Sequence, residues 1–161
     1  MFDALVLKDL STIAIAAGCG AVLGLEREFA RKPAGLRTHI FVCAGSALMM
    51  ILGQEIVNQF QEQESNSILS TDPIRALQAI VVGISFLGAG TIVHQRGEGV
   101  EGLTTAATIY LTAGIGVAAA VDRTSLALSV TVMAAVILLV VGFVEHKIAQ
   151  RAKRNGEDDS E

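Results

Sequence analysis

The residues best suited to chemistry in this 161-residue chain are charged and lie close together near its start. Two carboxylates and four cations fall within about three helical turns, namely Glu26, Arg27, Glu28, Arg31, Lys32 and Arg37. Carboxylates can bind a cation, guanidinium groups can bind an anion, and the two can also pair with each other. The spacing leaves two interpretations open: a charged membrane anchor with local ion pairs, or a polar binding site.

In the second interpretation, Glu26 and Arg37 lie at helix ends, where a lower dielectric makes pairing stronger. The candidate site on this side of the chain is Glu26, Arg27, Glu28, Gly35, Arg37 and Thr38. Glu26 or Glu28 could bind a divalent cation such as magnesium, but ion pairing or helix capping also explains these carboxylates. The sequence does not decide whether a metal binds.

A second polar pair lies in the middle of the chain. Asp72 and Pro73 supply an N-cap and a first-turn proline for a helix, and Arg75 follows. A helix cap with an interfacial arginine explains Asp72 and Arg75, and an outer binding site is the alternative. Threonines recur every four residues at Thr104, Thr108 and Thr112, with Thr105 beside them. This polar stripe must face neighbouring helices or line a path.

The elements that position these residues are five long uncharged stretches. All 12 Lys and Arg and all 16 Asp and Glu lie outside them. The stretches are residues 10–25, 38–54, 76–95, 102–121 and 124–144. As helices they reach roughly 24 to 32 Å, which is close to the hydrocarbon thickness of a bilayer. We therefore predict an all-α polytopic bundle of five transmembrane helices, with residues 1–147 as the membrane domain and 148–161 as a short polar tail.

The basic residues are sorted by position. Most lie between spans one and two, between spans three and four, and after span five, whereas Lys8, Arg75 and Arg123 fall on the other side. The positive-inside rule then places the amino terminus outside and the carboxyl terminus in the cytoplasm. By this topology Glu26 and Glu28 lie near the cytoplasmic face and Asp72 lies near the outer face, so they cannot share one ion.

Small residues predict where the helices touch. Ala16, Gly20 and Gly24 share one face of span one, and Gly88 and Gly90 end the apolar part of span three. We expect these faces to be interhelical contacts, and one of them to form a homo-oligomer. We expect residues 58–71 to form a solvated outer loop, because they are polar and contain no Lys or Arg. We expect His39, His94 and His146 to be interfacial boundary residues, although a pH sensor or metal site is the alternative.

Several motifs occur in a recognisable order along residues 10–121. They are Gly24-Leu25-Glu26-Arg27-Glu28, Ala34-Gly35-Leu36-Arg37-Thr38, Asp72-Pro73-x-Arg75, the run from Gly83 to Ile92 and the run from Gly102 to Thr108. Together they resemble the MgtC/SapB family. The resemblance implies a multi-pass protein of the bacterial inner membrane connected with growth at low magnesium and, in pathogens, with survival inside macrophages. It also implies a role in regulation, including interaction with the proton-translocating ATP synthase.

The regulatory members of that family carry a cytoplasmic carboxyl-terminal domain that these 161 residues do not include, so only the membrane domain's properties are expected to transfer. The function that we expect is regulatory, through helix contacts with lipid-embedded partners or a second copy. The alternative is a small ion or solute transporter, with Thr104, Thr105 and Thr108 along its path. We expect no enzyme, no cofactor and no nucleic-acid partner, because no nucleophile and base are grouped.

Overall fold

The computed structural model describes residues 4–63, 73–95 and 99–158. Five helices and a short hairpin follow one another along the chain. They are α1 (Ala4–Phe29), α2 (Leu36–Gln63), α3 (Pro73–Gly90), β1 (Val93–Gln95), β2 (Gly99–Glu101), α4 (Leu103–Ala120) and α5 (Thr124–Asp158). The predicted five-helix architecture is confirmed.

Four of the helices are long and apolar enough to cross a membrane. Their apolar parts are Ala4–Phe29, Leu36–Phe60, Leu103–Ala120 and Thr124–Glu145. The apolar helix at Ile74–Gly90 is shorter, yet 17 residues rise about 25 Å, which still approaches the hydrocarbon thickness. Large hydrophobic side chains cover the outside of α5, including Val132, Leu139 and Phe143. Such a surface requires lipid, so the chain is a multi-pass membrane protein.

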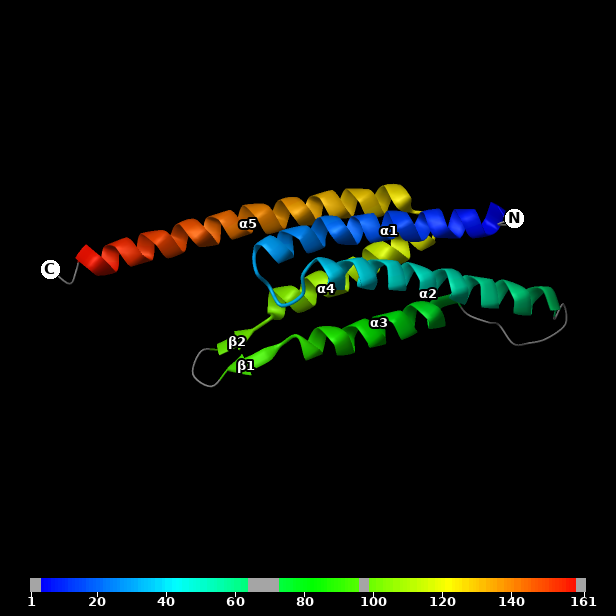
Figure 1. The fold of residues 1–161 in the computed structure, drawn as a ribbon. Coiled ribbons are helices and arrows are strands. Elements are labelled where there is room, and N and C mark those ends of the chain that lie inside the picture. The colour runs from blue at the N-terminus through cyan, green and yellow to red at the C-terminus, as the bar shows by residue number, and fades with distance from the viewer. Residues whose placement is uncertain (1–3, 64–72, 96–98, 159–161) are drawn as a thin grey trace.

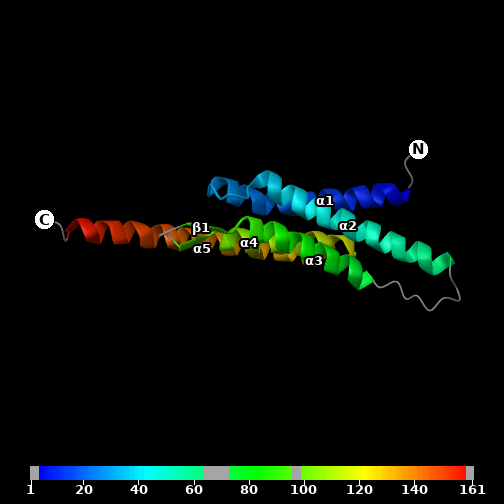
Figure 2. The ribbon, with the colours of Figure 1, turned by 90° about the horizontal axis from the view of Figure 1, so that it is seen from below.

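The helices form two layers. Figure 2 shows α1 and α2 together in one layer, with α3, α4 and α5 side by side in the other. Helix α4 lies in the middle and contacts each of the other four helices. Its buried face takes in nine residues and runs from Thr105 to Ala120. The structure therefore places α4 as the central helix, around which the others pack.

Two glycines hold α2 tightly between α1 and α4. Gly20 of α1 lies against the carbonyl of His39, and a Cβ placed there would collide with that oxygen. Gly116 of α4 lies in the same way against the carbonyl of Cys43. The two carbonyls are one helical turn apart on α2, so the backbones of three helices meet at one level. Such close approach is how membrane helices gain packing energy, because lipid supplies no hydrophobic force between them.

Successive connections between the helices lie at alternate ends of the bundle, as an odd number of spans requires. The connection between α1 and α2, the hairpin and the last turns of α5 lie at one end (Figure 1). We call this the hinge end, after the hinge segment of residues 24–38. The first turn of α1, the carboxyl end of α2 and the turn between α4 and α5 lie at the opposite end. There, the exposed side chains of Lys8 and Asp122 pair at 3.2 Å and join α1 to that turn.

Two sequence expectations about element boundaries were wrong. Span three was predicted to reach residue 95, but α3 ends at Gly90, and residues 93–95 pair as a strand with 99–101. The segment 58–63, expected in a loop, continues helix α2, whereas 64–71 lie outside the described residues. Helix α5 passes without a break through residue 147 to Asp158. Helix propensity and packing extend a helix past its apolar stretch, which charge counting cannot detect.

The contact between Gly20 and the His39 carbonyl leads to a test of the bundle. Gly20→Leu must push α1 away from α2, so we expect a marked fall in the thermal midpoint, corresponding to about 2 kcal/mol or more. Gly18→Leu makes the same change on the same helix, where a Cβ meets nothing within 4 Å. Circular dichroism in detergent measures both variants. Equal midpoints for Gly20→Leu and Gly18→Leu would contradict the close contact.

Candidate functional site

The hinge segment turns the chain back between α1 and α2 without a long loop. Helix α1 ends at Phe29, and the amide of Lys32 donates to the carbonyl of Arg27 at 3.0 Å, which closes the helix. Arg31 takes a left-handed backbone conformation, with a φ of 53°, and reverses the chain. Helix α2 then begins at Leu36. The sequence thus brings the charged residues of α1 next to the first turn of α2.

Glu28 caps that first turn from a distance of eight residues. The backbone N–H of Leu36 donates to Oε2 of Glu28 at 3.0 Å, which satisfies an amide that has no partner within the helix. The negative charge also lies at the positive end of the α2 dipole. Gly35 leaves room for this carboxylate, since a Cβ on Gly35 would overlap Oε2. Glu28 and Gly35, which are predicted site residues, therefore cooperate in a structural contact.

Glu26 and Arg27 form a buried ion pair. Arg27 donates from Nε to Oε2 of Glu26 at 2.6 Å and from Nη2 to Oε1 at 3.0 Å. The side chains are only 12% and 5% exposed, respectively. This bidentate geometry is the strong form of a carboxylate–guanidinium contact. The third nitrogen, Nη1, is buried and has no hydrogen-bond partner within the described residues.

His39 is the residue of this region that sequence reasoning missed. The expectation of a boundary residue was wrong, because the side chain is fully buried. It packs against Gly24, whose missing Cβ leaves space for it. Its Nδ1 lies 3.0 Å from the carbonyl of Gly35 and must donate there, so a neutral ring has an acceptor at Nε2. That Nε2 is buried and, within the described residues, unpartnered.

A signal for the burial of His39 exists in the sequence. His39 lies on the same helical face as Cys43 and Ser46, at spacings of four and seven residues, and all three are buried. The side chains of His94 and His146 lie outside the described residues. Cys19 and Cys43, both buried and free, fill the core as small residues do.

The other predicted polar residues are not brought to this cluster. Arg37 is exposed and Thr38 is half-buried, although both belong to the first turn of α2. Arg75 is exposed near the opposite end of the bundle. Asp72 lies outside the described residues. The hinge therefore holds one buried group, consisting of Glu26, Arg27 and His39, with Glu28 as an exposed cap beside it.

The threonines of α4 divide between the interior and the surface. Thr105 and Thr108 are buried, whereas Thr104 is exposed. The hydroxyl of Thr108 donates to the carbonyl of Thr105 at 2.9 Å, and the hydroxyl of Thr112 donates to the carbonyl of Thr108 at 2.7 Å. These hydroxyls thus bond to their own helix and do not need water or a solute.

The small residues also fall into two groups. Gly20 and Gly24 pack against α2, and Gly88 lies in ordinary contact with Ala106 of α4. Gly90 is exposed, and a Cβ there would meet nothing within 4 Å. The interhelical faces of the sequence analysis are therefore used mostly inside one copy of the chain.

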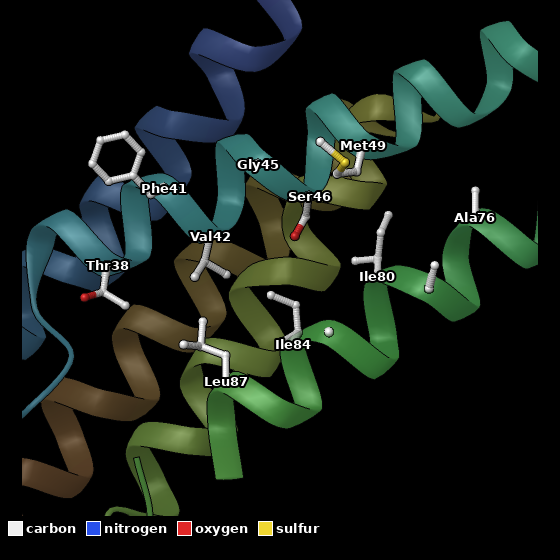
Figure 3. A pocket seen from close by; sticks show the side chains of 12 residues that line it. Thr38, Phe41, Val42, Gly45, Ser46, Met49, Ala76, Ile80, Ile84 and Leu87 are labelled. Carbon is white, nitrogen blue, oxygen red and sulfur yellow. The ribbon is translucent and has the colours of Figure 1, made fainter. Parts of the chain in front are cut away.

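An apolar groove of about 630 Å³ separates α2 from α3. Figure 3 shows Val42, Ser46 and Met49 of α2 along one wall and Ile80, Ile84 and Leu87 of α3 along the other. Gly45 and Gly83 also line the groove, and a Cβ on either would meet nothing within 4 Å. The groove thus offers two places where another backbone could approach closely.

The comparisons with known proteins identify the family. A family model described as the MgtC family matches residues 13–147. The chain belongs to the MgtC family. This match takes in the hinge, the groove and the central helix α4, so the features described above all belong to the MgtC-type membrane region.

Named relatives support the assignment. The chain is 37% identical over 133 residues to the protein MgtC of Salmonella typhimurium, covering 82% of this chain and 50% of that protein. It is 43% identical over 104 residues to the putative magnesium transporter YhiD of Escherichia coli, covering 65% of this chain and 46% of that protein. It is 36% identical over 109 residues to the protein SapB of Bacillus subtilis, covering 68% and 46%. No solved structure matches the chain.

The buried pair at the hinge leads to a test of its energetics. Glu26→Gln leaves the Arg27 guanidinium buried without its counter-charge, so we expect the free energy of unfolding to fall by about 3 kcal/mol. The double variant Glu26→Gln with Arg27→Met removes both charges and should recover much of that loss. Chemical unfolding in detergent measures both. A Glu26→Gln single variant as stable as the parent protein would show that the charge of Arg27 does not need Glu26.

The contact between Glu28 and Gly35 leads to a double-mutant cycle. We expect Gly35→Ala to displace the Glu28 carboxylate and to cost about 1 kcal/mol, which is typical of a lost helix cap. In a Glu28→Ala background the cap is already absent, so the same Gly35→Ala change should cost almost nothing. The difference measures the coupling. Additive effects of the two substitutions would contradict the capping role.

Proposed function

We propose that this chain acts in adaptation of a bacterium to low magnesium, as a protein of the inner membrane that works through helix contacts with a second copy of itself. Membership of the MgtC family supports the connection to magnesium, as does the name of one relative, a putative magnesium transporter. The chain spans about half the length of those relatives. The proposal therefore concerns only the activity of the membrane region.

The observation that carries the proposed mechanism is how the interior is packed. Backbones meet at Gly20 and Gly116, and the buried threonine hydroxyls of α4 bond to their own helix. The buried ionised pair lies at the hinge end, away from the midplane. Within the described residues, no three His, Cys, Asp or Glu side chains gather where they could hold a metal ion. This packing favours a protein that acts by contact over one that conducts magnesium through a single copy.

The groove between α2 and α3 is the surface that we propose for the contact. Its walls are apolar, and the open spaces at Gly45 and Gly83 would let a helix of the second copy approach α2 and α3 closely. The small-residue face of α1, which was one of several candidates for assembly, is already occupied by α2. A bulky residue at Gly83 should therefore block assembly without disturbing the fold of one copy.

The orientation is part of the same proposal. The hinge end carries Arg31, Lys32 and Arg37, and the basic residues after Val144 continue along α5 beyond the same end. The positive-inside rule assigns that end to the cytoplasm. The buried pair of Glu26 and Arg27 then lies at the cytoplasmic boundary.

Growth at low magnesium tests the physiological role. A strain with its own copy deleted should grow poorly at micromolar magnesium, and the parent gene should restore growth. We expect Gly83→Leu to lose both the restoration of growth and the dimer mass in detergent, whereas Gly18→Leu keeps both. Restored growth by a monomeric Gly83→Leu protein would contradict action through the second copy.

Purified protein in liposomes tests the transporter alternative. We expect magnesium flux no higher than in empty liposomes for the parent protein. Flux that rises with the amount of protein and falls in a Glu26→Gln variant of matched reconstitution would replace the contact mechanism with transport.

A further inference from the structure

A second groove, between α1 and α5 at the hinge end, differs from the apolar groove in its chemistry. Its volume is about 640 Å³. Four charged residues line it: Glu26, Arg27 and Lys32 from the α1 side, and Glu145 from α5. Apolar side chains of α5, namely Leu138, Leu139 and Phe143, form much of the remaining wall. We call this the α1–α5 groove.

Polarity changes along the length of the α1–α5 groove. On α5 the lining runs from Leu138 to Glu145, which is about 10 Å of helix. Leu138 belongs to the apolar stretch of α5, and Glu145 is the last residue of that stretch. The groove therefore begins within the hydrocarbon and opens at its polar boundary. A ligand that fills it must be apolar at one end and polar at the other.

Arg27 lines the groove, but its guanidinium is already held by Glu26. Its Nε and Nη2 are occupied by Glu26, but Nη1 is buried and has no partner within the described residues. The side chain is 5% exposed. Because Nη1 has almost no accessible surface, a ligand in the groove does not reach it. Glu26 and Arg27 neutralise each other, which leaves Lys32 and Glu145 as lining charges without an ion-pair partner within the described residues.

The charges of the lining select among lipid headgroups. Two carboxylates and two cations line the groove, so its formal charges balance. Lys32 suits a phosphate, while Glu145 suits a cation that can donate hydrogen bonds. A headgroup with only a negative charge would repel the carboxylate of Glu145. A quaternary ammonium has no N–H to donate to that carboxylate. The charge pattern matches phosphoethanolamine.

We propose that the α1–α5 groove is a binding site for phosphatidylethanolamine of the surrounding membrane. One acyl chain lies along Leu138 and Leu139, the phosphate accepts from Lys32, and the ammonium donates to Glu145. The bound lipid ties the hinge to α5. This site is separate from the α2–α3 groove and does not depend on the proposed second copy.

Native mass spectrometry of the full purified chain tests the site, with phosphatidylethanolamine, phosphatidylcholine or phosphatidylglycerol of identical acyl chains added to the detergent. We expect the parent protein to retain phosphatidylethanolamine about tenfold better than the other two, as one charged hydrogen bond allows. Glu145→Gln should remove the preference over phosphatidylcholine.

Gly142 allows a steric test of the same groove. It lines the groove, and a Cβ there would meet nothing within 4 Å, so Gly142→Leu should fill the space without loss of folding. We expect retention of phosphatidylethanolamine to fall at least about fivefold, whereas Gly18→Leu retains it like the parent. Equal circular dichroism midpoints for the two variants establish that both fold.

Four results would overturn the proposal. They are equal retention of phosphatidylethanolamine and phosphatidylcholine by the parent, tighter retention of phosphatidylglycerol, unchanged retention in Gly142→Leu, or a change of oligomeric mass in Gly142→Leu with no change in bound lipid. The last result would assign the α1–α5 groove to a second copy of the chain.

Discussion

The bundle depends on the close approach of the α2 backbone to α1 on one side and α4 on the other. Gly20 and Gly116 permit this approach against the carbonyls of His39 and Cys43, which are one turn apart. In a bilayer, lipid chains are as apolar as leucine side chains, so helices associate through dispersion forces at short range and not through exclusion of water. The three helices that meet here form the closely packed centre of the protein, and α3 and α5 flank them.

The position of the charged hinge follows from that contact. Because α1 and α2 lie tightly together, the connection between them is short, and the residues of that connection are crowded at the membrane boundary. Glu26 and Arg27 are buried as a result, and their charges are tolerable there because they satisfy each other through two hydrogen bonds. Glu28 instead accepts a hydrogen bond from the first turn of α2. Glu26 and Glu28 thus have separate structural roles.

The same packing decides which surfaces are left for partners. Glycines that face the interior form contacts between helices of one copy, whereas Gly45 and Gly83 line the α2–α3 groove without a close neighbour. The α1–α5 groove is open as well, but its lining is amphipathic and charged. A family protein linked to magnesium can thus present one surface suited to another helix and another surface suited to a lipid headgroup, with no conducting path implied by either.

The sequence by itself determined the number of helices, their approximate positions and the alternation of the two ends, because sustained absence of charge over a bilayer's thickness is a strong physical constraint. It also located the charged hinge and the close-packing face of α1. Element boundaries were less predictable. Helix α5 continues to Asp158, and the residues after α3 form a hairpin although their composition does not distinguish them from the end of a helix. Local composition does not specify the packing contacts that extend a helix or end it.

Only the tertiary structure decided the partners of the polar side chains. Glu26 pairs with its neighbour Arg27 and not with Arg37, and His39, which the sequence suggested was a boundary residue, is fully buried beneath Gly24. The threonines of α4 likewise serve their own helix. Sequence spacing specifies which face of a helix a residue occupies, but what lies opposite that face depends on how distant helices cross, and that is a property of the assembled bundle.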